Sequence, residues 1–223
     1  MGRLNRFDLN RIITDYGTAC LFETGTLWGD GIAYALSAPF RNIFSVEIMP
    51  EIAAKAKHRF TTEYKVHIIH ADSVSAMKDR LPAIRHNIIF WLDAHFPGAD
   101  AGMKLYNQES NQQLRLPLEE EIKTICSLRK GFQDVFIIDD LRIYEDGPYE
   151  NGNAPSDVLP RANRNIEFIY DCFRDTHVIL KSYADEGYLM LFPKNRYKKK
   201  HSKWFNLFRR KPDTNPNYFV EEI

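Results

Sequence analysis

The chain has 223 residues, of which 44% are hydrophobic, 13% aromatic and 27% charged, and this composition excludes a disordered or fibrous protein. The 30 basic and 30 acidic side chains cancel, but Lys194 to Lys211 holds nine bases and no acid. Residues 1–193 hold 21 bases and 27 acids, a formal charge of −6. We therefore predict one sizeable domain, residues 1–193, and a basic tail, residues 194–223.

The three cysteines, Cys20, Cys126 and Cys172, are widely separated and lie in apolar surroundings. This pattern favours reduced core residues over a disulfide framework or a zinc site. The longest apolar run, Ile88 to Leu92, is far shorter than the ~18 residues of a membrane-spanning helix, and the N-terminus lacks the pattern of a secretion signal. We predict a cytoplasmic protein.

Short apolar runs alternate with segments of helical periodicity, which predicts βα units and a mainly parallel sheet. The five predicted parallel strands are Ala19–Glu23, Asn42–Ile48, Val66–His70, Asn87–Asp93 and Asp134–Asp139. The predicted helices are Gly29–Ser37, Pro50–Thr61, Ser73–Arg80, Leu118–Arg129 and Asn165–Phe173. Two last runs, His177–Tyr183 and Gly187–Phe192, predict an antiparallel hairpin. The predicted fold is a doubly wound α/β domain with seven strands.

Two long polar segments, Phe96–Arg115 and Tyr144–Asn163, interrupt the alternation. Loops of this length in a compact domain are usually functional or disordered. We predict that the first segment covers a substrate and that the second lines its other side.

Acidic residues stand at the end of every predicted parallel strand, where ligands bind in open sheets of this kind. A single acid in this position commonly caps the following helix instead, but five in register favour a binding site. They are Glu23, Glu47, Asp72, Asp93, and Asp139 with Asp140.

The turn after the first strand reads Glu23-Thr-Gly25-Thr26-Leu-Trp-Gly29, which lacks the glycine pattern of a dinucleotide fingerprint and the Gly-Lys-Ser/Thr of a P-loop. With an acid ending the second strand and another after the third, it resembles the class I S-adenosylmethionine-dependent methyltransferases over residues 17–193. The resemblance implies that the turn residues Glu23, Gly25, Thr26 and Gly29 hold the amino-acid end of the cofactor. It implies that Glu47 binds the ribose hydroxyls and that Asp72, with Ser73, lies at the adenine.

The runs that end in Asp93-Ala-His95 and in Asp139-Asp140-Leu-Arg142 resemble the metal-dependent sugar O-methyltransferases of macrocin and novobiocin biosynthesis. This resemblance implies that Asp93, Asp139 and Asp140 bind Mg²⁺ or Mn²⁺. Three converging carboxylates would repel one another unless they were protonated or neutralised, and their hard oxygens suit such an ion. The alternative is that Asp140 caps the next turn and only Asp139 faces the cleft.

His95 follows Asp93 by two residues, about where several relatives carry a catalytic base. With an ordinary pKa of ~6.5, a histidine suits proton abstraction from a hydroxyl, so we predict catalytic roles for His95 and Asp93. The alternative is a histidine that only hydrogen-bonds the loop or the metal site. Arg142 is the candidate substrate-binding residue, although pairing with a carboxylate is the commoner fate of such an arginine.

The segment Lys198–Lys211 combines basic residues with Trp204, Leu207 and Phe208, which would share one face of a helix. It predicts contact with an anionic membrane surface, which would make the protein peripheral at the inner face of a membrane. Nucleic-acid contact, a solubilising tail and docking on a second subunit in a homo-oligomer are the alternatives.

The predicted function is transfer of a methyl group from S-adenosylmethionine to a hydroxyl of a sugar or glycan, as in polysaccharide biosynthesis, assisted by a divalent ion and with His95 as general base. The alternatives are a nucleic-acid or other small-molecule methyltransferase and a binding module without catalysis. The acidic body argues against nucleic acid, as does the sequence Asp93-Ala-His95-Phe96 in place of an Asp-Pro-Pro-Tyr-type motif.

Overall fold

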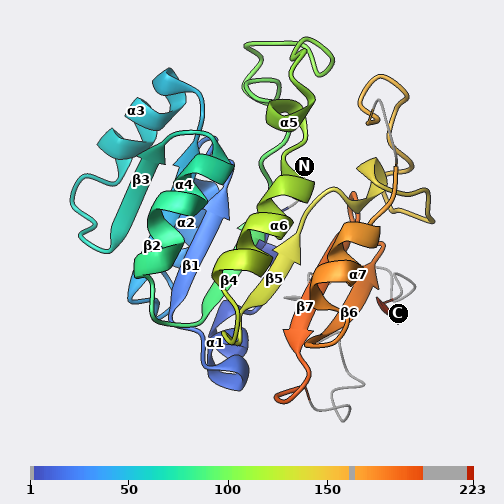
Figure 1. Cartoon of the computed structure of the whole chain (residues 1–223). Coiled ribbons are helices and arrows are strands. Elements are labelled where there is room, and N and C mark those ends of the chain that lie inside the picture. Colours follow the sequence, from blue (N-terminus) through green and yellow to red (C-terminus); the bar gives the residue numbers. More distant parts are fainter. Residues whose placement is uncertain (1–2, 161–163, 198–219) are drawn as a thin grey trace.

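The computed structural model describes residues 3–160, 164–197 and 220–223. They form a sheet with the strand order β3-β2-β1-β4-β5-β7-β6-β8 (Figure 1). Strands β1 to β5 are parallel, and β7 runs antiparallel to its neighbours β5 and β6. The strands are Cys20–Thr24 (β1), Asn42–Glu47 (β2), Val66–His70 (β3), Ile88–Leu92 (β4), Val135–Ile138 (β5), His177–Ser182 (β6), Tyr188–Pro193 (β7) and Val220–Glu222 (β8).

The predicted doubly wound sheet with its C-terminal hairpin is confirmed, and β8 adds an eighth strand antiparallel to β6. This strand lies within the predicted tail, so the end of the chain returns to the domain. The basic segment Lys198–Lys211 lies outside the described residues. No helix in the described ranges is long and apolar enough to cross a membrane.

Helices cover both faces of the sheet. Apolar residues of α4, α6 and α7 pack on one face, and those of α1 and α2 pack on the other. The α-helices are Leu9–Tyr16 (α1), Asp30–Ala35 (α2), Pro50–Arg59 (α3), Ser73–Arg80 (α4), Gln112–Arg115 (α5), Leu118–Leu128 (α6) and Glu167–Phe173 (α7). Single 3₁₀ turns at Leu4–Arg6 (η1), Leu81–Ala83 (η2) and Leu141–Ile143 (η3) complete the described elements.

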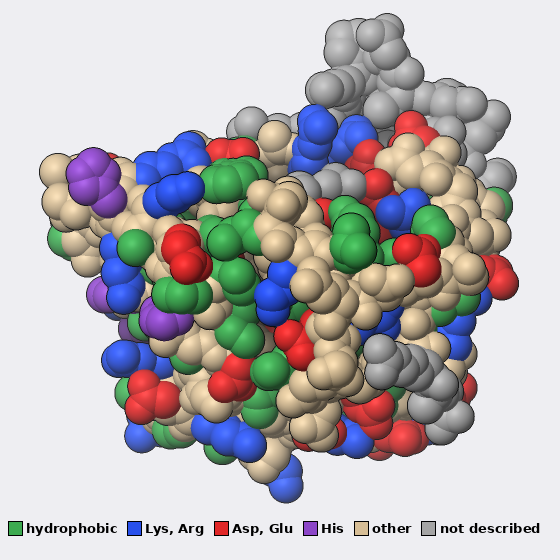
Figure 2. Space-filling view, turned by 90° about the horizontal axis from the view of Figure 1, so that it is seen from above, with side chains coloured by type: hydrophobic (Ala, Val, Ile, Leu, Met, Phe, Trp, Pro, Cys, Tyr) green, Lys and Arg blue, Asp and Glu red, His purple; other side chains and the backbone are tan. Residues whose placement is uncertain are grey.

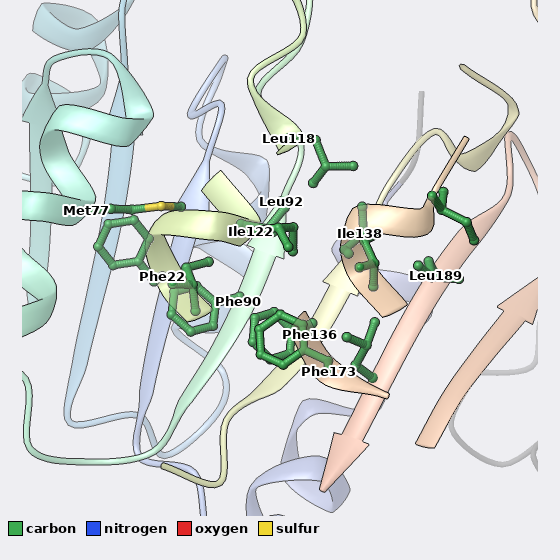
Figure 3. Packing of buried hydrophobic residues seen from close by; sticks show 14 of the residues in the cluster. Phe22, Met77, Phe90, Leu92, Leu118, Ile122, Phe136, Ile138, Phe173 and Leu189 are labelled. Atoms are coloured by element: carbon green, nitrogen blue, oxygen red, sulfur yellow. The ribbon is translucent and has the colours of Figure 1, made fainter. Parts of the chain in front are cut away.

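A row of aromatic rings runs across the sheet under α6 and α7 (Figure 3). The ring centroids of Phe22 on β1 and Phe90 on β4 are 5.8 Å apart, and those of Phe90 and Phe136 on β5 are 5.1 Å apart. Phe173 of α7 continues the row at 4.6 Å from Phe136. Large buried rings of this kind contribute strongly to core packing, so they fix the relative positions of β1, β4 and β5. The ends of these three strands carry the candidate site.

The two long polar segments rise above the carboxyl ends of the parallel strands (Figure 1). Figure 2 looks down on this edge, where hydrophobic side chains run across the middle of the face and acidic and basic side chains lie beside them. Both segments thus lie at the edge that carries the candidate site, and their roles over and beside a substrate stay predictions.

Candidate active site

The turn between β1 and α2 approaches the end of β4 so closely that a glycine is needed. Gly25 has φ +84°, and a Cβ atom there would lie 2.6 Å from the carbonyl oxygen of Asp93. Glycine adopts such backbone without steric cost. On its other side the turn is fixed by Thr26, whose hydroxyl oxygen lies 2.7 Å from that of Ser45 on β2. The turn and Asp93 consequently border the same space.

Glu47, the last residue of β2, holds the turn through one carboxylate oxygen and the start of α3 through the other. One accepts a hydrogen bond from the backbone N–H of Leu27 at 3.0 Å, and the other from that of Met49 at 2.8 Å. The residue is 6% exposed. Burial raises the pKa of Glu47, although these backbone hydrogen bonds act to lower it. Each oxygen keeps a lone pair that could accept a ligand hydroxyl.

A first cavity, cavity 1, lies between the ends of β2 and β3 and the root of the 96–115 loop. Gly25, Glu47, Asp72, Ser73 and Asp93 line it, so five predicted cofactor residues meet at one place. Asp72 also caps α4 by accepting the backbone N–H of Ser75 at 2.9 Å, which shows that capping and lining are compatible. The apolar walls of the cavity include Ile48, Ile52, Phe96 and Leu114.

A second cavity, cavity 2, continues from the first on the other side of the β1–α2 turn. Gly25, Leu27 and Asp93 line both cavities, whereas Glu23 and Thr26 line only cavity 2. The predicted residue Gly29 lines neither of them. Gly29 has a φ of +79° and precedes α2, and a Cβ atom there would lie 2.6 Å from the ring of Phe60, so this close packing calls for glycine whether or not the residue also contacts a cofactor.

Glu23 is the most deeply buried acid of the turn, at 2% exposure. Its carboxylate accepts a hydrogen bond from the hydroxyl of Ser45 at 2.5 Å. On its other side lies Gly31, where a Cβ atom would come within 1.9 Å of Oε1. Burial raises the pKa of Glu23 to about 8 despite the hydrogen bond from Ser45.

This raised pKa makes the free energy of unfolding depend on pH. Between the ordinary value of 4.5 and about 8, folded Glu23 keeps a proton that the unfolded chain releases, so stability falls as pH rises through this interval. Glu23→Gln removes the titration and is expected to gain stability relative to the native chain from pH 5 to pH 8, by a few kcal/mol at most, at ~1.4 kcal/mol per pKa unit. Urea unfolding of both proteins at pH 5, 6.5 and 8 measures this. A difference that does not change with pH would contradict it.

A cluster of ionisable side chains stands where β4 and β5 end. His95 Nε2 lies 3.0 Å from Asp140 Oδ2, and Nδ1 lies 3.5 Å from Asp93 Oδ1. Arg142 Nε donates to the other oxygen of Asp140 at 3.0 Å. Asp139 adjoins the cluster, and its backbone N–H donates to the carbonyl of Leu92 at 3.1 Å. The structure thus brings the four predicted catalytic and metal-binding residues to one edge.

The charged groups of this cluster shift one another's pKa values. Burial, followed by the charge of Asp139, raises the pKa of Asp93, and burial with the charge of Asp140 raises that of Asp139. Burial also acts to raise the pKa of Asp140, but His95 and Arg142 hold it below its ordinary value. For His95, burial acts to lower the pKa, yet the hydrogen bond to Asp140 and the nearby carboxylates raise it to about 10. His95 is therefore protonated at neutral pH in this arrangement.

The predicted metal ligands do not form an ion-binding group as they stand. Both oxygens of Asp140 are taken, one by His95 and one by Arg142. Among residues 3–160, 164–197 and 220–223, no three Asp, Glu, His or Cys side chains are grouped so that they could hold one metal ion. The positive charge opposite Asp140 comes from the chain itself, and Arg142 is engaged with a carboxylate.

Sequence reasoning missed a second acidic pair at the same edge. Asp185 and Glu186 form the turn between β6 and β7 and are 8% and 5% exposed. Arg6 of η1 pairs with Asp185, and Arg142 lies 3.8 Å from Glu186. Because β6 runs parallel to β5, its end points to the same edge. The acids in the predicted hairpin turn were the available signal.

A second missed residue is Glu121 on α6, which is 1% exposed. Burial raises its pKa to about 7, although the hydrogen bonds to Ser73 and Thr24 act to lower it. Thr24 is the last residue of β1, and its carbonyl oxygen accepts a hydrogen bond from the backbone N–H of Asp93 at 3.2 Å. Glu121 therefore connects α6 to the end of β1 and to the start of α4, next to the candidate site.

The two loops above the site are joined by one buried arginine. Arg115 is 2% exposed, and its guanidinium lies 5.0 Å from the centroid of the Phe96 ring. It donates to the backbone carbonyl of Tyr106 in its own loop at 3.1 Å. It also donates to those of Asp157 and Leu159 in the second loop, at 2.9 and 3.1 Å. Hydrogen bonds from this one side chain thus link the two loops to each other.

Comparison with solved structures relates this arrangement to known proteins, while no family model and no curated protein matches the sequence. A proposed caffeoyl-CoA O-methyltransferase from Staphylococcus aureus has a TM-score of 0.58 at 14% identity, over 86% of this chain and 84% of that one. The O-methyltransferase from Bacillus cereus in complex with S-adenosylhomocysteine has a TM-score of 0.53 at 12% identity, over 83% and 79%. The chain has a Rossmann-like methyltransferase fold.

A third structure with this methyltransferase fold is the S-adenosylhomocysteine-bound methyltransferase PaMTH1 from Podospora anserina. Its TM-score is 0.52 at 12% identity, over 83% of this chain and 76% of that one. At such identities the likeness concerns the fold, so the roles of individual residues rest on the geometry described above.

Proposed function

We propose that the chain is an S-adenosylmethionine-dependent O-methyltransferase. The observation that carries the proposal is the junction of the two cavities. Cavity 1 offers Glu47 and Asp72 for a ribose and an adenine, and cavity 2 offers Glu23 for an ammonium group. Both cavities end at Asp93, which adjoins His95. A cofactor that filled both would present its sulfonium methyl group to the ionisable cluster.

The first experiment is calorimetry with S-adenosylhomocysteine, followed by transfer of labelled methyl groups from S-adenosylmethionine. Sugar nucleotides, lipid-linked glycans, nucleic acids and small phenols serve as parallel acceptors. We propose a sugar or glycan hydroxyl, because carboxylates and a charged imidazole at one edge suit a ligand rich in hydroxyl groups. Absence of binding would refute the cofactor, and binding without any transfer would favour a non-catalytic module.

In this proposal the acceptor hydroxyl lies between Asp93 and His95 and gives up its proton as the methyl group moves. The C–S bond of the sulfonium breaks and the new C–O bond forms, while His95 gives its Nδ1 proton to the carboxylate of Asp93 and takes up the proton of the hydroxyl in its place, so that the cluster gains one proton. Three carboxylates face one imidazolium there, so the cluster can take up a further proton. Alignment of the hydroxyl with the methyl group supplies the larger part of the rate, as in other reactions that depend on orientation.

His95→Asn is expected to lower kcat by about 100-fold or more, the usual contribution of a positioned acid–base group. The affinity for S-adenosylhomocysteine is expected to stay within about threefold of the native value, because His95 borders the cofactor cavity without supplying an anchoring carboxylate. Single-turnover kinetics and calorimetry on the same preparation separate the two effects. An unchanged kcat would show that a group other than His95 accepts the proton.

The divalent ion is the part of the sequence prediction that the grouping of the described residues does not support, so no step is assigned to it. The test is methyl transfer in EDTA. Loss of activity that Mg²⁺ or Mn²⁺ restores would support an ion held by Asp93, Asp139 and Asp140. Unchanged activity in EDTA, together with unchanged activity of Asp139→Asn, would show that methyl transfer does not need a divalent ion.

The basic segment keeps its proposed role at an anionic membrane surface, which rests on its sequence. Glutamine at Lys198, Lys199 and Lys200 is expected to weaken binding to vesicles that contain phosphatidylserine, at about 1 kcal/mol per lysine. Substitution is preferable to truncation after residue 193, because truncation would also remove β8. Equal flotation of both proteins would contradict the role. Neutral vesicles are the control.

A further inference from the structure

Arg3 stands at the rim of cavity 2 with its side chain exposed. Three acids, Glu23, Asp30 and Asp93, line the same cavity. Among the described residues that line it, Arg3 alone is basic. The lining of the cavity therefore combines three acids with one guanidinium.

The backbone holds Arg3 in this place. Its N–H donates to the hydroxyl of Tyr188 at 3.2 Å, and Leu4 next to it is buried. Arg6 pairs with Asp185 one turn further on, and the ring of Phe7 meets that of Tyr188 edge-on at 5.1 Å. The segment 3–7 is thus fixed on the body of the domain, so the side chain of Arg3 leaves from a defined point.

The amino-acid end of S-adenosylmethionine carries an ammonium group and a carboxylate. The buried carboxyl of Glu23 suits the ammonium group. The carboxylate needs a basic partner, and Arg3 is the basic residue among the described residues that line the cavity. A guanidinium binds a carboxylate through two parallel N–H···O bonds, which an ammonium cannot reproduce. On the basis of the proposed cofactor, we propose that Arg3 binds its α-carboxylate, so that segment 3–7 closes the site over the amino-acid end.

The test compares two ligands that share the adenosine part. S-Adenosylhomocysteine carries the carboxylate, and 5′-methylthioadenosine lacks the whole amino-acid end. Arg3→Ala is expected to weaken binding of the first by about tenfold to 100-fold, the usual loss of a charge-assisted pair, and to leave the second within about twofold. Arg3→Lys is expected to lose about threefold to tenfold, because it keeps the charge without the fork. Isothermal calorimetry measures the affinities of the native full chain and of both variants for both ligands.

Arg11→Ala is the matched control, since Arg11 lies on α1 and pairs with Asp15 at 3.4 Å. Its affinities for both ligands are expected to equal the native ones. Equal weakening of both ligands by Arg3→Ala, or none, would overturn the assignment of Arg3 alone. A native chain that binds neither ligand would refute the proposed cofactor instead, so the two failures are distinguishable. Melting curves of the variants verify that they are folded.

Discussion

Replacement of Arg115 by methionine is expected to loosen both loops above the sheet together and to lower the free energy of unfolding by about 1–3 kcal/mol. Three backbone carbonyls, those of Tyr106, Asp157 and Leu159, would lose their shared donor. Methionine keeps the length and apolar body of the side chain, so the lost hydrogen bonds dominate the change. Arg115→Lys is expected to be nearly as damaging, because one ammonium group cannot span carbonyls in two loops.

Hydrogen exchange followed by mass spectrometry, with urea unfolding, measures this. Faster exchange is expected in residues 96–115 and also in 144–160, although the second loop carries no substitution. Lys104→Met is the matched control on the same loop, where Lys104 lies 3.4 Å from Glu109 and is one-third exposed. It is expected to change stability by less than about 0.5 kcal/mol. Faster exchange in the first loop alone would show that the two loops are independent.

Glu47→Ala is expected to weaken binding of S-adenosylhomocysteine by at least about 100-fold. In the proposed binding mode both ribose hydroxyls would lose their hydrogen bonds to a charged acceptor. The substitution has a second effect, because the N–H groups of Leu27 and Met49 lose their acceptor. The turn that separates the two cavities would then be less well positioned. Both effects act in the same direction on the cofactor.

Calorimetry of Glu47→Ala, Glu47→Gln and Glu51→Ala tests this expectation. Glutamine keeps one oxygen of the same shape without the charge, so an intermediate loss is expected. Glu51 lies on the exposed first turn of α3 and serves as the matched acid control, with native affinity expected. Near-native affinity of Glu47→Ala would place the ribose elsewhere and weaken the proposed function itself.

The fold could be predicted because its signals are local. Each parallel strand is a short, mainly apolar run that ends near an acid, and two of the elements, β3 and α4, begin and end at the predicted residues. Helix α1 was not predicted, although its buried residues Leu9, Ile12 and Tyr16 recur at helical spacing. Its ends depend on caps, since Asp8 accepts the N–H of Arg11 and Gly17 has φ +64°. Strand β8 was missed because three residues give no periodicity.

The candidate site was predictable only as far as the topology places strand ends together. The acids at the ends of β1 to β5 could be expected at one edge, and Glu47, Asp72 and Asp93 do line one cavity. The charge of His95 could not be foreseen, because it depends on distances to Asp93 and Asp140 that no sequence spacing determines. Arg115 gave no signal either, because a lone arginine in a polar loop is usually exposed.

The contact between Glu23 and Gly31 limits how these two positions can change over evolutionary time. Any side chain at position 31 would push the carboxylate of Glu23 away from Ser45 and out of its place beside cavity 2. A shorter acid at position 23 would relieve the contact, so alanine at position 31 is compatible with aspartate at position 23. Among homologous chains the two positions are therefore expected to covary, with glycine retained wherever glutamate is present.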